Sequence, residues 1–137
     1  MKAKNSTYFS IFFLVFCSLL ITAGCSTDNY EKRQLNNGEL YYSKNISQDR
    51  VDSLCDYTNQ CAIFNDEVHL ARLIKTDSTY ELSLSVPPEM YNSEQYQSYA
   101  EVLAGQLSED VFDKALVKIH LTDDKFNVKV TKSSQQD

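Results

Sequence analysis

The chain has 137 residues, with 19 acidic and 13 basic side chains and a formal net charge of −6 at pH 7. This negative charge argues against nucleic acid as a partner, because tight binding to a phosphate backbone needs clustered Lys and Arg. Nucleotide binding through a glycine-rich phosphate loop is not expected either, since the chain's three glycines are Gly24, Gly38 and Gly105.

The first 24 residues have the layout of an export signal. Lys2 and Lys4 precede an apolar run over residues 8–21 that contains no charge, and small residues follow it. The stretch from residue 8 to residue 24 has 17 residues, fewer than the ~20 that a membrane-spanning helix needs. We therefore predict a signal peptide over residues 1–24 that is removed in the mature protein, in preference to an uncleaved membrane anchor.

The end of this stretch, Thr22-Ala23-Gly24-Cys25, resembles the lipobox of bacterial lipoproteins, although that family usually has Leu, Val or Ile at the position of Thr22. The resemblance implies that Cys25 is lipidated and that its acyl chains hold the protein to a membrane. Two or more acyl chains make such an anchor stable. Ser26 resembles an outer-membrane sorting signal, which implies an outer-membrane protein facing the periplasm if the host is Gram-negative.

Without residues 1–24 the chain keeps 11 basic and all 19 acidic residues, a net charge of −8. Residues 25–37 are polar and lack a sustained apolar period, which predicts a lipidated, flexible tether. Residues 38–131 suit a single folded domain, and the polar residues 132–137 are expected to form a disordered tail. The acidity either keeps a small exported domain soluble or supplies an acidic surface for a basic partner.

The domain is expected to begin with a short aromatic strand at residues 40–42 and a helix over residues 48–60. Ser47 is the predicted N-cap of this helix, and Ile46 and Val51 have the spacing of a hydrophobic staple. Apolar residues then recur at helical spacing, so the helix is expected to lie on a core.

A hairpin is predicted next, with strands over residues 68–74 and 80–86 and a turn at residues 76–78. In the second strand, apolar side chains alternate with Glu81, Ser83 and Ser85. We expect these three side chains to form a polar face of the sheet that meets water.

Two prolines at residues 87–88 end this strand, and a second helix is expected to start at Asn92 or Ser93 and to run to about residue 107. Alternating apolar residues then predict strands over residues 117–121 and 126–130. The order of elements predicts an α+β domain of the ferredoxin-like split βαβ type, β-α-β-β-α-β plus a C-terminal strand. Two helices would cover one face of an antiparallel-rich sheet.

Three segments of the domain, residues 39–42, 54–57 and 107–112, resemble pieces of a domain found in uncharacterised bacterial proteins. The resemblance covers residues 38–130 and rests on short apolar and capping strings. It implies one folded unit and no particular activity.

Two cysteines, Cys55 and Cys61, remain as thiols once Cys17 is removed with the signal and Cys25 is lipidated. An oxidising cell envelope favours a disulfide between them. Six residues along an unbroken helix, however, rise ~9 Å, whereas a disulfide needs Cα atoms within ~7 Å. A disulfide, two free thiols, and a zinc or redox role therefore stay open as alternatives.

Catalytic constellations are not apparent in the sequence. His69 and His120 both lie in predicted strands without an expected partner, which favours surface histidines over catalytic ones. Turn formation and helix-terminal charge explain the acidic pairs at residues 109–110 and 123–124 better than a calcium site does, because no ligand register of about twelve residues is present. We expect no catalytic residue, no metal and no cofactor.

Two hypotheses of function remain. The first is a non-catalytic envelope lipoprotein that binds or modulates another envelope protein through the polar sheet face of Glu81, Ser83 and Ser85, with Tyr91 as a further contact residue. Tyr96 and Tyr99 lie on the apolar stripe of the second helix, which favours core packing for them. The alternative is a small envelope enzyme or thiol-redox protein that uses Cys55 or Cys61.

Overall fold

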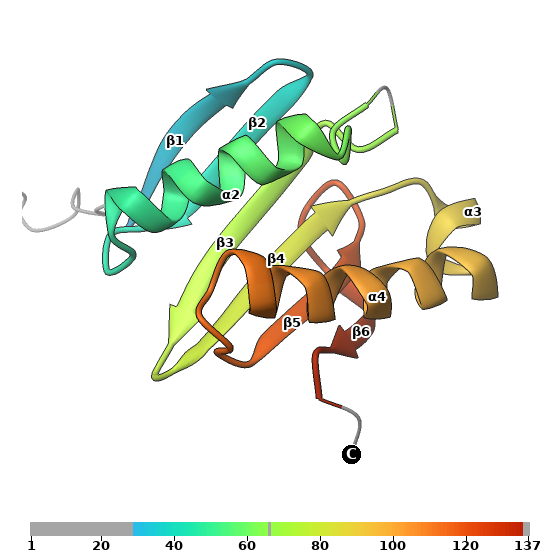
Figure 1. Ribbon diagram of the computed structural model, residues 1–137. Helices are drawn as coiled ribbons and strands as arrows, with labels where there is room; N and C mark the ends of the chain where they lie inside the picture. Colours follow the sequence, from blue (N-terminus) through green and yellow to red (C-terminus); the bar gives the residue numbers. More distant parts are fainter. Residues whose placement is uncertain (1–28, 66, 136–137) are drawn as a thin grey trace, which may run out of the picture.

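The structure, a computed structural model, describes residues 29–65 and 67–135 (Figure 1). The predicted signal peptide, Cys25 and the first residues of the predicted tether lie outside the described residues. Within the described part, six strands and three helices follow one another along the chain. Their order is β1 (Tyr30–Leu35), β2 (Gly38–Ser43), α2 (Gln48–Gln60), β3 (Leu70–Thr76), β4 (Thr79–Ser85), α3 (Pro88–Tyr91), α4 (Glu94–Asp110), β5 (Val117–Thr122) and β6 (Val128–Ser133).

The six strands form one mixed sheet in which the spatial order equals the chain order, β1 to β6. Strands β1–β2, β3–β4 and β5–β6 pair antiparallel, whereas β2–β3 and β4–β5 pair parallel. Helix α2 connects the first parallel pair, and α3 with α4 connects the second. Both long helices lie on the same face of the sheet (Figure 1). The predicted α+β class is therefore confirmed.

The ferredoxin-like strand order is not confirmed, because a split βαβ unit leaves room for another strand between its parallel strands. Here Leu40 is directly opposite Ala71 in the β2–β3 pair. Strands β2 and β3 run opposite to β4 and β5, yet in each pair the later strand lies on the same side of the earlier one. The helices that connect the two pairs lie on one face of the sheet. The two crossovers must therefore have opposite hands. One of them departs from the right-handed rule for parallel β-strand connections.

The core lies between the sheet and the two long helices. The strands contribute alternate side chains that are almost fully buried, and α2 and α4 contribute their apolar stripes. Ile46 and Val51 are both buried, as the predicted staple requires. Ser47 occupies the N-cap position of α2 as predicted, although its side chain makes no capping hydrogen bond.

The opposite face of the sheet has no helix over it, yet it is not the polar, wet surface that the alternation in β4 predicted. Ser83 is 3% exposed and Ser85 is 6% exposed. Larger side chains cover this face instead, since the Arg72 guanidinium lies 4.6 Å from the Phe126 ring centroid and 5.8 Å from that of Tyr30. Small serines between large neighbours become buried without any helix above them.

The segment predicted as a flexible tether contains β1, so that prediction is wrong for residues 30–35. Strand β1 pairs along its whole length with β2, and Leu35 is buried in the core. The Tyr42 hydroxyl donates to Glu31 at 2.9 Å, which adds a side-chain link between the two strands. At the other end of the domain, β6 extends to Ser133, past the predicted start of the tail at residue 132.

The two ends of the helix layer differ. At the end where α2 begins and α4 finishes, called the closed end below, Arg50 of α2 donates to the Val111 carbonyl at 2.7 Å and forms an ion pair with Asp113. Phe112 stacks on Tyr80 there, with ring centroids 4.1 Å apart. At the opposite end, called the open end, α2 finishes and α4 begins, and the two helices leave a hollow between them.

Candidate functional site

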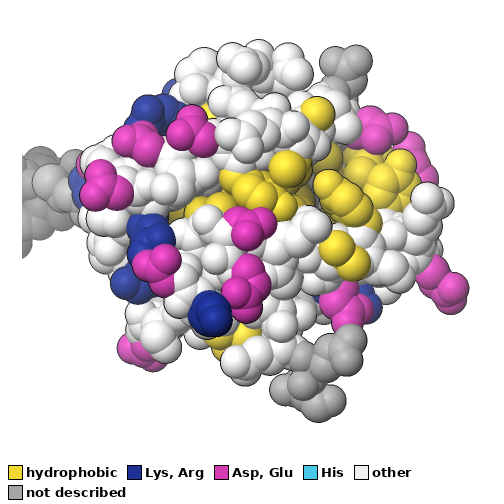
Figure 2. Space-filling model, viewed as in Figure 1, with side chains coloured by type: hydrophobic (Ala, Val, Ile, Leu, Met, Phe, Trp, Pro, Cys, Tyr) yellow, Lys and Arg dark blue, Asp and Glu magenta, His cyan; other side chains and the backbone are white. Residues whose placement is uncertain are grey.

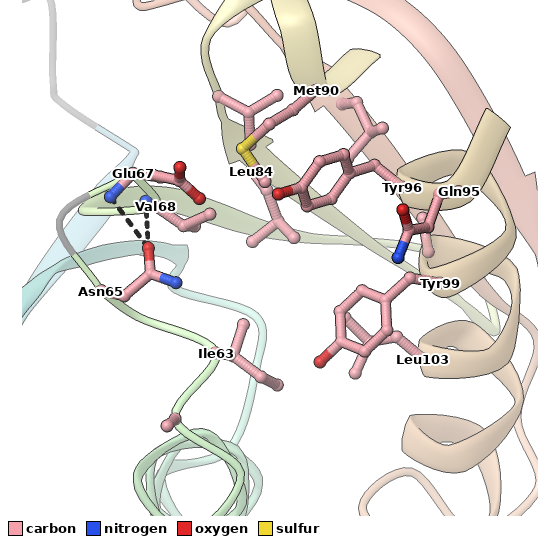
Figure 3. A pocket seen from close by; sticks show the side chains of 14 residues that line it. Ile63, Asn65, Glu67, Val68, Leu84, Met90, Gln95, Tyr96, Tyr99 and Leu103 are labelled. Carbon is pink, nitrogen blue, oxygen red and sulfur yellow. Dashed lines mark hydrogen bonds between the residues drawn. The ribbon is translucent and has the colours of Figure 1, made fainter. Parts of the chain in front are cut away.

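An apolar cleft of about 300 Å³ opens at the open end, where β4 and β5 finish side by side. Ligands of open sheets commonly bind beyond the carboxyl ends of parallel strands. The lining residues come from the α2–β3 loop, from the ends of β4 and β5, and from α3 and α4 (Figure 3). They are Ala62, Ile63, Asn65, Glu67, Val68, Leu84, Val86, Met90, Gln95, Tyr96, Tyr99, Ala100, Leu103 and Leu121.

The floor of the cleft is made of buried apolar side chains. Leu84 and Leu121 come from neighbouring strands, and Leu103 comes from the stripe of α4 that faces the sheet. Because α2 ends at Gln60, no helical side chain covers this part of the floor from the other side. The cleft is thus a gap in the helix layer rather than a void inside the core. Figure 2 shows the apolar surface continuing between the two helices toward this end.

Tyr96 and Tyr99 form the wall on the α4 side. Tyr96 is 37% exposed and Tyr99 is 50% exposed, so the core packing that their helical spacing favoured is wrong for both. Figure 3 shows both rings projecting from α4 toward the α2–β3 loop. Tyrosine is common at binding surfaces because it combines a large apolar ring with a hydroxyl that can stay hydrated.

The opposite wall is the loop between α2 and β3. Ala62 has φ 49°, in the left-handed region, and it turns the chain away from the helix axis. The Asn65 side-chain oxygen then accepts hydrogen bonds from the backbone N–H groups of Glu67 and Val68 at 2.8 and 2.9 Å. These bonds hold the loop as a defined wall, with Val68 buried and the Glu67 side chain at the rim.

A second hollow of about 350 Å³ adjoins the cleft, and Glu67 and Val86 line both. Its other lining residues are His69, Ser85, Pro87, Pro88, Tyr91, Asp123 and Asp124. Tyr91, predicted as a contact residue, is half-buried in this second hollow. Three carboxylates therefore surround the second hollow, whereas the cleft has an apolar lining.

Asp123 remains charged because the turn between β5 and β6 surrounds its carboxylate with donors. The Asn127 side chain and the backbone N–H groups of Asn127 and Lys125 donate to it at 2.9 to 3.0 Å. The hydrogen bonds from Asn127 are the main reason that the pKa of Asp123 falls to about 2. Its charge is committed to this turn and to Lys129, whose Nζ lies 3.5 Å away.

Charge is unevenly distributed between the ends of the molecule. Residues 76–113 include eight acidic residues and no Lys or Arg, but this stretch spans both ends, since Asp110 and Asp113 lie at the closed end. At the open end, Glu89 and Glu94 lie at the starts of α3 and α4, near the three carboxylates of the second hollow. The lining of the cleft and of the second hollow contains no Lys or Arg either. On the face in Figure 2, basic side chains gather mostly on the side where α2 begins, at the closed end. The open end therefore combines apolar surface with negative charge.

The two described cysteines are free thiols, so the disulfide alternative is not realised. Helix α2 continues unbroken to Gln60, which keeps the buried Cys55 and the exposed Cys61 apart, as the helical rise requires. Burial raises the pKa of the Cys55 thiol. A raised pKa lowers the fraction of nucleophilic thiolate, which is the opposite of what a reactive cysteine needs.

Neither histidine lines the cleft. His120 lies on the face of the sheet away from the helices, with its Nε2 3.5 Å from a Glu81 carboxylate oxygen and its Nδ1 2.8 Å from the Thr131 hydroxyl. His69 is exposed and lines the second hollow. Among residues 29–65 and 67–135, no group of three His, Cys, Asp or Glu side chains is placed to hold a metal ion.

The water-facing polar surface that the sequence predicted on β4 is not formed. Ser83 and Ser85 are buried, and Glu81 is engaged beside His120. The residues that sequence reasoning missed are those of the cleft, above all Tyr96 and Tyr99. Their available signal was the cluster of tyrosines around the start of α4, within a stretch that contains no Lys or Arg.

Within the described part of the chain, no helix is long and apolar enough to span a membrane. Searches of curated proteins and of solved structures found no match. A family model described as the AF_1994_N family N-terminal domain matches residues 32–134, which is more than half of the chain. The chain therefore belongs to this domain family, which fits the expected resemblance of residues 38–130 to an uncharacterised domain, with slightly wider bounds.

Proposed function

We propose that this family member is a bacterial envelope lipoprotein, lipidated at Cys25, that binds a segment of another envelope protein in the apolar cleft of its open end. The cleft is the observation that carries the binding part of the proposal. It has an apolar floor, a firm loop on one side and two exposed tyrosines on the other. Such concave apolar sites with a few polar groups at the rim are the usual form of binding sites.

The anchoring part of the proposal is supported by the signal pattern of residues 1–24 and by the lipobox-like sequence ending at Cys25. In a Gram-negative host, Ser26 favours an outer-membrane location facing the periplasm.

The position of Asn29 bears on how the cleft is oriented in such an anchored protein, because β1 starts at the closed end of the sheet. Strand β3 has seven residues, so about 20 Å of sheet separates the anchored end from the cleft. The cleft then points away from the membrane, toward proteins rather than lipid.

A non-catalytic role fits the chemistry of the cleft, which offers tyrosine hydroxyls, two amides and one carboxylate around apolar groups. The thiol-enzyme alternative gains little support, since Cys55 is buried with a raised pKa and neither Cys55 nor Cys61 lines the cleft. Binding without a cofactor is therefore the function that the geometry favours.

Intact mass of protein from the native membrane fraction tests the anchor. We expect a chain that starts at Cys25 and carries acyl mass, and we expect the Cys25→Ser variant to lose both the cleavage and the acyl mass. An unacylated chain that starts at residue 1 in the wild-type protein would contradict the anchoring part of the proposal.

Site-specific photocrosslinking in native cells tests the binding part. A photoreactive residue in place of Tyr99 is expected to capture one discrete protein. The same residue in place of Val102 is the matched control, because Val102 is 57% exposed on the same helix but does not line the cleft. Equal crosslinking at the two positions, or none at Tyr99, would contradict binding in the cleft.

A further inference from the structure

The two adjoining hollows of the open end differ in chemistry. The cleft accepts apolar groups, and the second hollow is edged by Glu67, Asp123 and Asp124. Both hollows share Glu67 and Val86, so one ligand can occupy them together. A ligand that occupies both hollows would therefore carry an apolar group for the cleft and, close to it along its length, a polar group for the second hollow.

Two of the three carboxylates remain available to a ligand. Asp123 is committed to its turn and to Lys129. The side chains of Glu67 and Asp124 are exposed and have no hydrogen bond or ion pair with another described residue. Because no Lys or Arg lines either hollow, a cation on the ligand would meet attraction without competition from the walls.

From this arrangement, and resting on the proposed function, we infer that the occupant of the cleft is a positively charged segment of a partner protein. An aliphatic or aromatic side chain of this segment fills the cleft between Tyr99 and the α2–β3 loop. A Lys or Arg close to it in sequence lies in the second hollow against Glu67 and Asp124.

Charge complementarity decides between this occupant and others. An anionic lipid surface or a nucleic acid would be repelled by the acidic open end, and the membrane lies at the far end of the domain if Cys25 is the anchor. An uncharged lipid chain would fill the cleft but would leave the second hollow empty. A peptide segment with mixed chemistry uses both hollows.

Selection from a displayed library of random 12-residue peptides against the lipid-free protein, residues 26–137, tests the inference. Peptides that combine an apolar or aromatic residue with a neighbouring Lys or Arg are expected to be enriched. Their affinity should fall roughly fivefold in Glu67→Gln or Asp124→Asn, as for a partly exposed ion pair. It should also fall as the salt concentration rises, because exposed charges are screened.

Matched controls separate the two hollows from the rest of the surface. Tyr99→Ser should abolish selection of the peptides, whereas Val102→Ser and Glu109→Gln, which replace exposed side chains outside both hollows, should leave it unchanged. Unchanged far-ultraviolet circular dichroism of each variant shows that loss of binding is not loss of folding.

Each other outcome has a defined meaning. Enrichment of apolar peptides without basic residues, lost in Tyr99→Ser, would overturn the inferred charge but leave the proposed cleft function intact. No enrichment, or enrichment insensitive to Tyr99→Ser, would overturn the inference; together with no crosslink at Tyr99, it would overturn the proposed function too. A concentration-dependent dimer that Tyr99→Ser disrupts would identify a second copy of this chain as the occupant.

Discussion

The closed and open ends of the helix layer are built from the same two helices, yet only one of them is sealed. At the closed end, Arg50 bridges the start of α2 to the segment after α4, and Phe112 fills the space beneath. At the open end, α2 stops at Gln60 and the α2–β3 loop turns away from α4. Tight packing and the proposed binding surface thus lie at opposite ends of one small domain.

The largest effect is expected from Phe112→Ala at the closed end. Phe112 is almost fully buried and stacks on Tyr80, so its removal should lower the free energy of unfolding by ~3–5 kcal/mol. Met90→Ala, which enlarges a cleft that already reaches solvent, should cost less, about 2 kcal/mol. Urea unfolding of both variants measures the difference. Equal losses of unfolding free energy in the two variants would contradict the difference in packing between the closed end and the open end.

Gly38→Ala is expected to have the next largest effect. A Cβ at this position would lie 2.6 Å from the His69 carbonyl oxygen and 2.9 Å from the Phe64 ring, where the backbone of the open end approaches β2. The variant should lose ~1–3 kcal/mol of stability. Gly105→Ala in α4 is the control, since nothing lies within 4 Å of its added Cβ. It should gain ~0.5–1 kcal/mol from helix propensity, so a loss in thermal denaturation there would count against this account.

Arg50→Ala should have a smaller effect than either core change. The variant loses a charged hydrogen bond to the Val111 carbonyl and a partly exposed ion pair with Asp113, together about 1–2 kcal/mol. Arg33→Ala provides the comparison, because the Arg33 side chain forms an exposed ion pair with Asp52 but no hydrogen bond to a backbone carbonyl, and it should cost less stability than Arg50→Ala. Hydrogen exchange of the α4 C-terminal turn should accelerate in Arg50→Ala alone. Acceleration in both variants would show that Arg50 has no special role at the closed end.

The smallest effect is the acid dependence of the turn that carries Asp123 at the open end. Its pKa is about 2 in the folded protein and ~3.9 when unfolded. This depressed pKa adds stability above pH ~4, and that contribution is lost as the pH falls through about 2. Asp123→Asn should therefore be less stable than the wild type at pH 6, with a difference that shrinks between pH 4 and pH 2. A difference that stays constant over this range would contradict the contribution of the charge.

Local patterns predicted the two long helices and strands β4 and β5 well. The bounds of α2 agree with the expected residues 48–60, because Val51, Leu54 and Thr58 repeat at helical spacing and are all buried. Strands β4 and β5 lie within a residue of their expected positions, because strict alternation of apolar and polar residues is typical of a β-strand and not of a helix. The structure of these elements therefore follows from the local pattern of apolar residues alone.

Strand β1 was missed because its sequence, YEKRQL, has a single buried residue, Leu35. An edge strand with one partner needs little apolar alternation, so periodicity is a weak signal there. The turn residues Asn36 and Asn37 followed by Gly38 were the available hint, since such residues favour a hairpin.

By itself, the sequence determined the α+β class, the apolar stripes, the acidic stretch over residues 76–113 and the export-signal pattern, because each depends on residues close together in the chain. Only the tertiary structure decided the sequential strand order and the cleft. Both depend on how α2 and α4 sit relative to each other over one face of the sheet. Helical spacing puts Tyr96 and Tyr99 on the apolar side of α4, but the early end of α2 leaves them exposed rather than buried in a core.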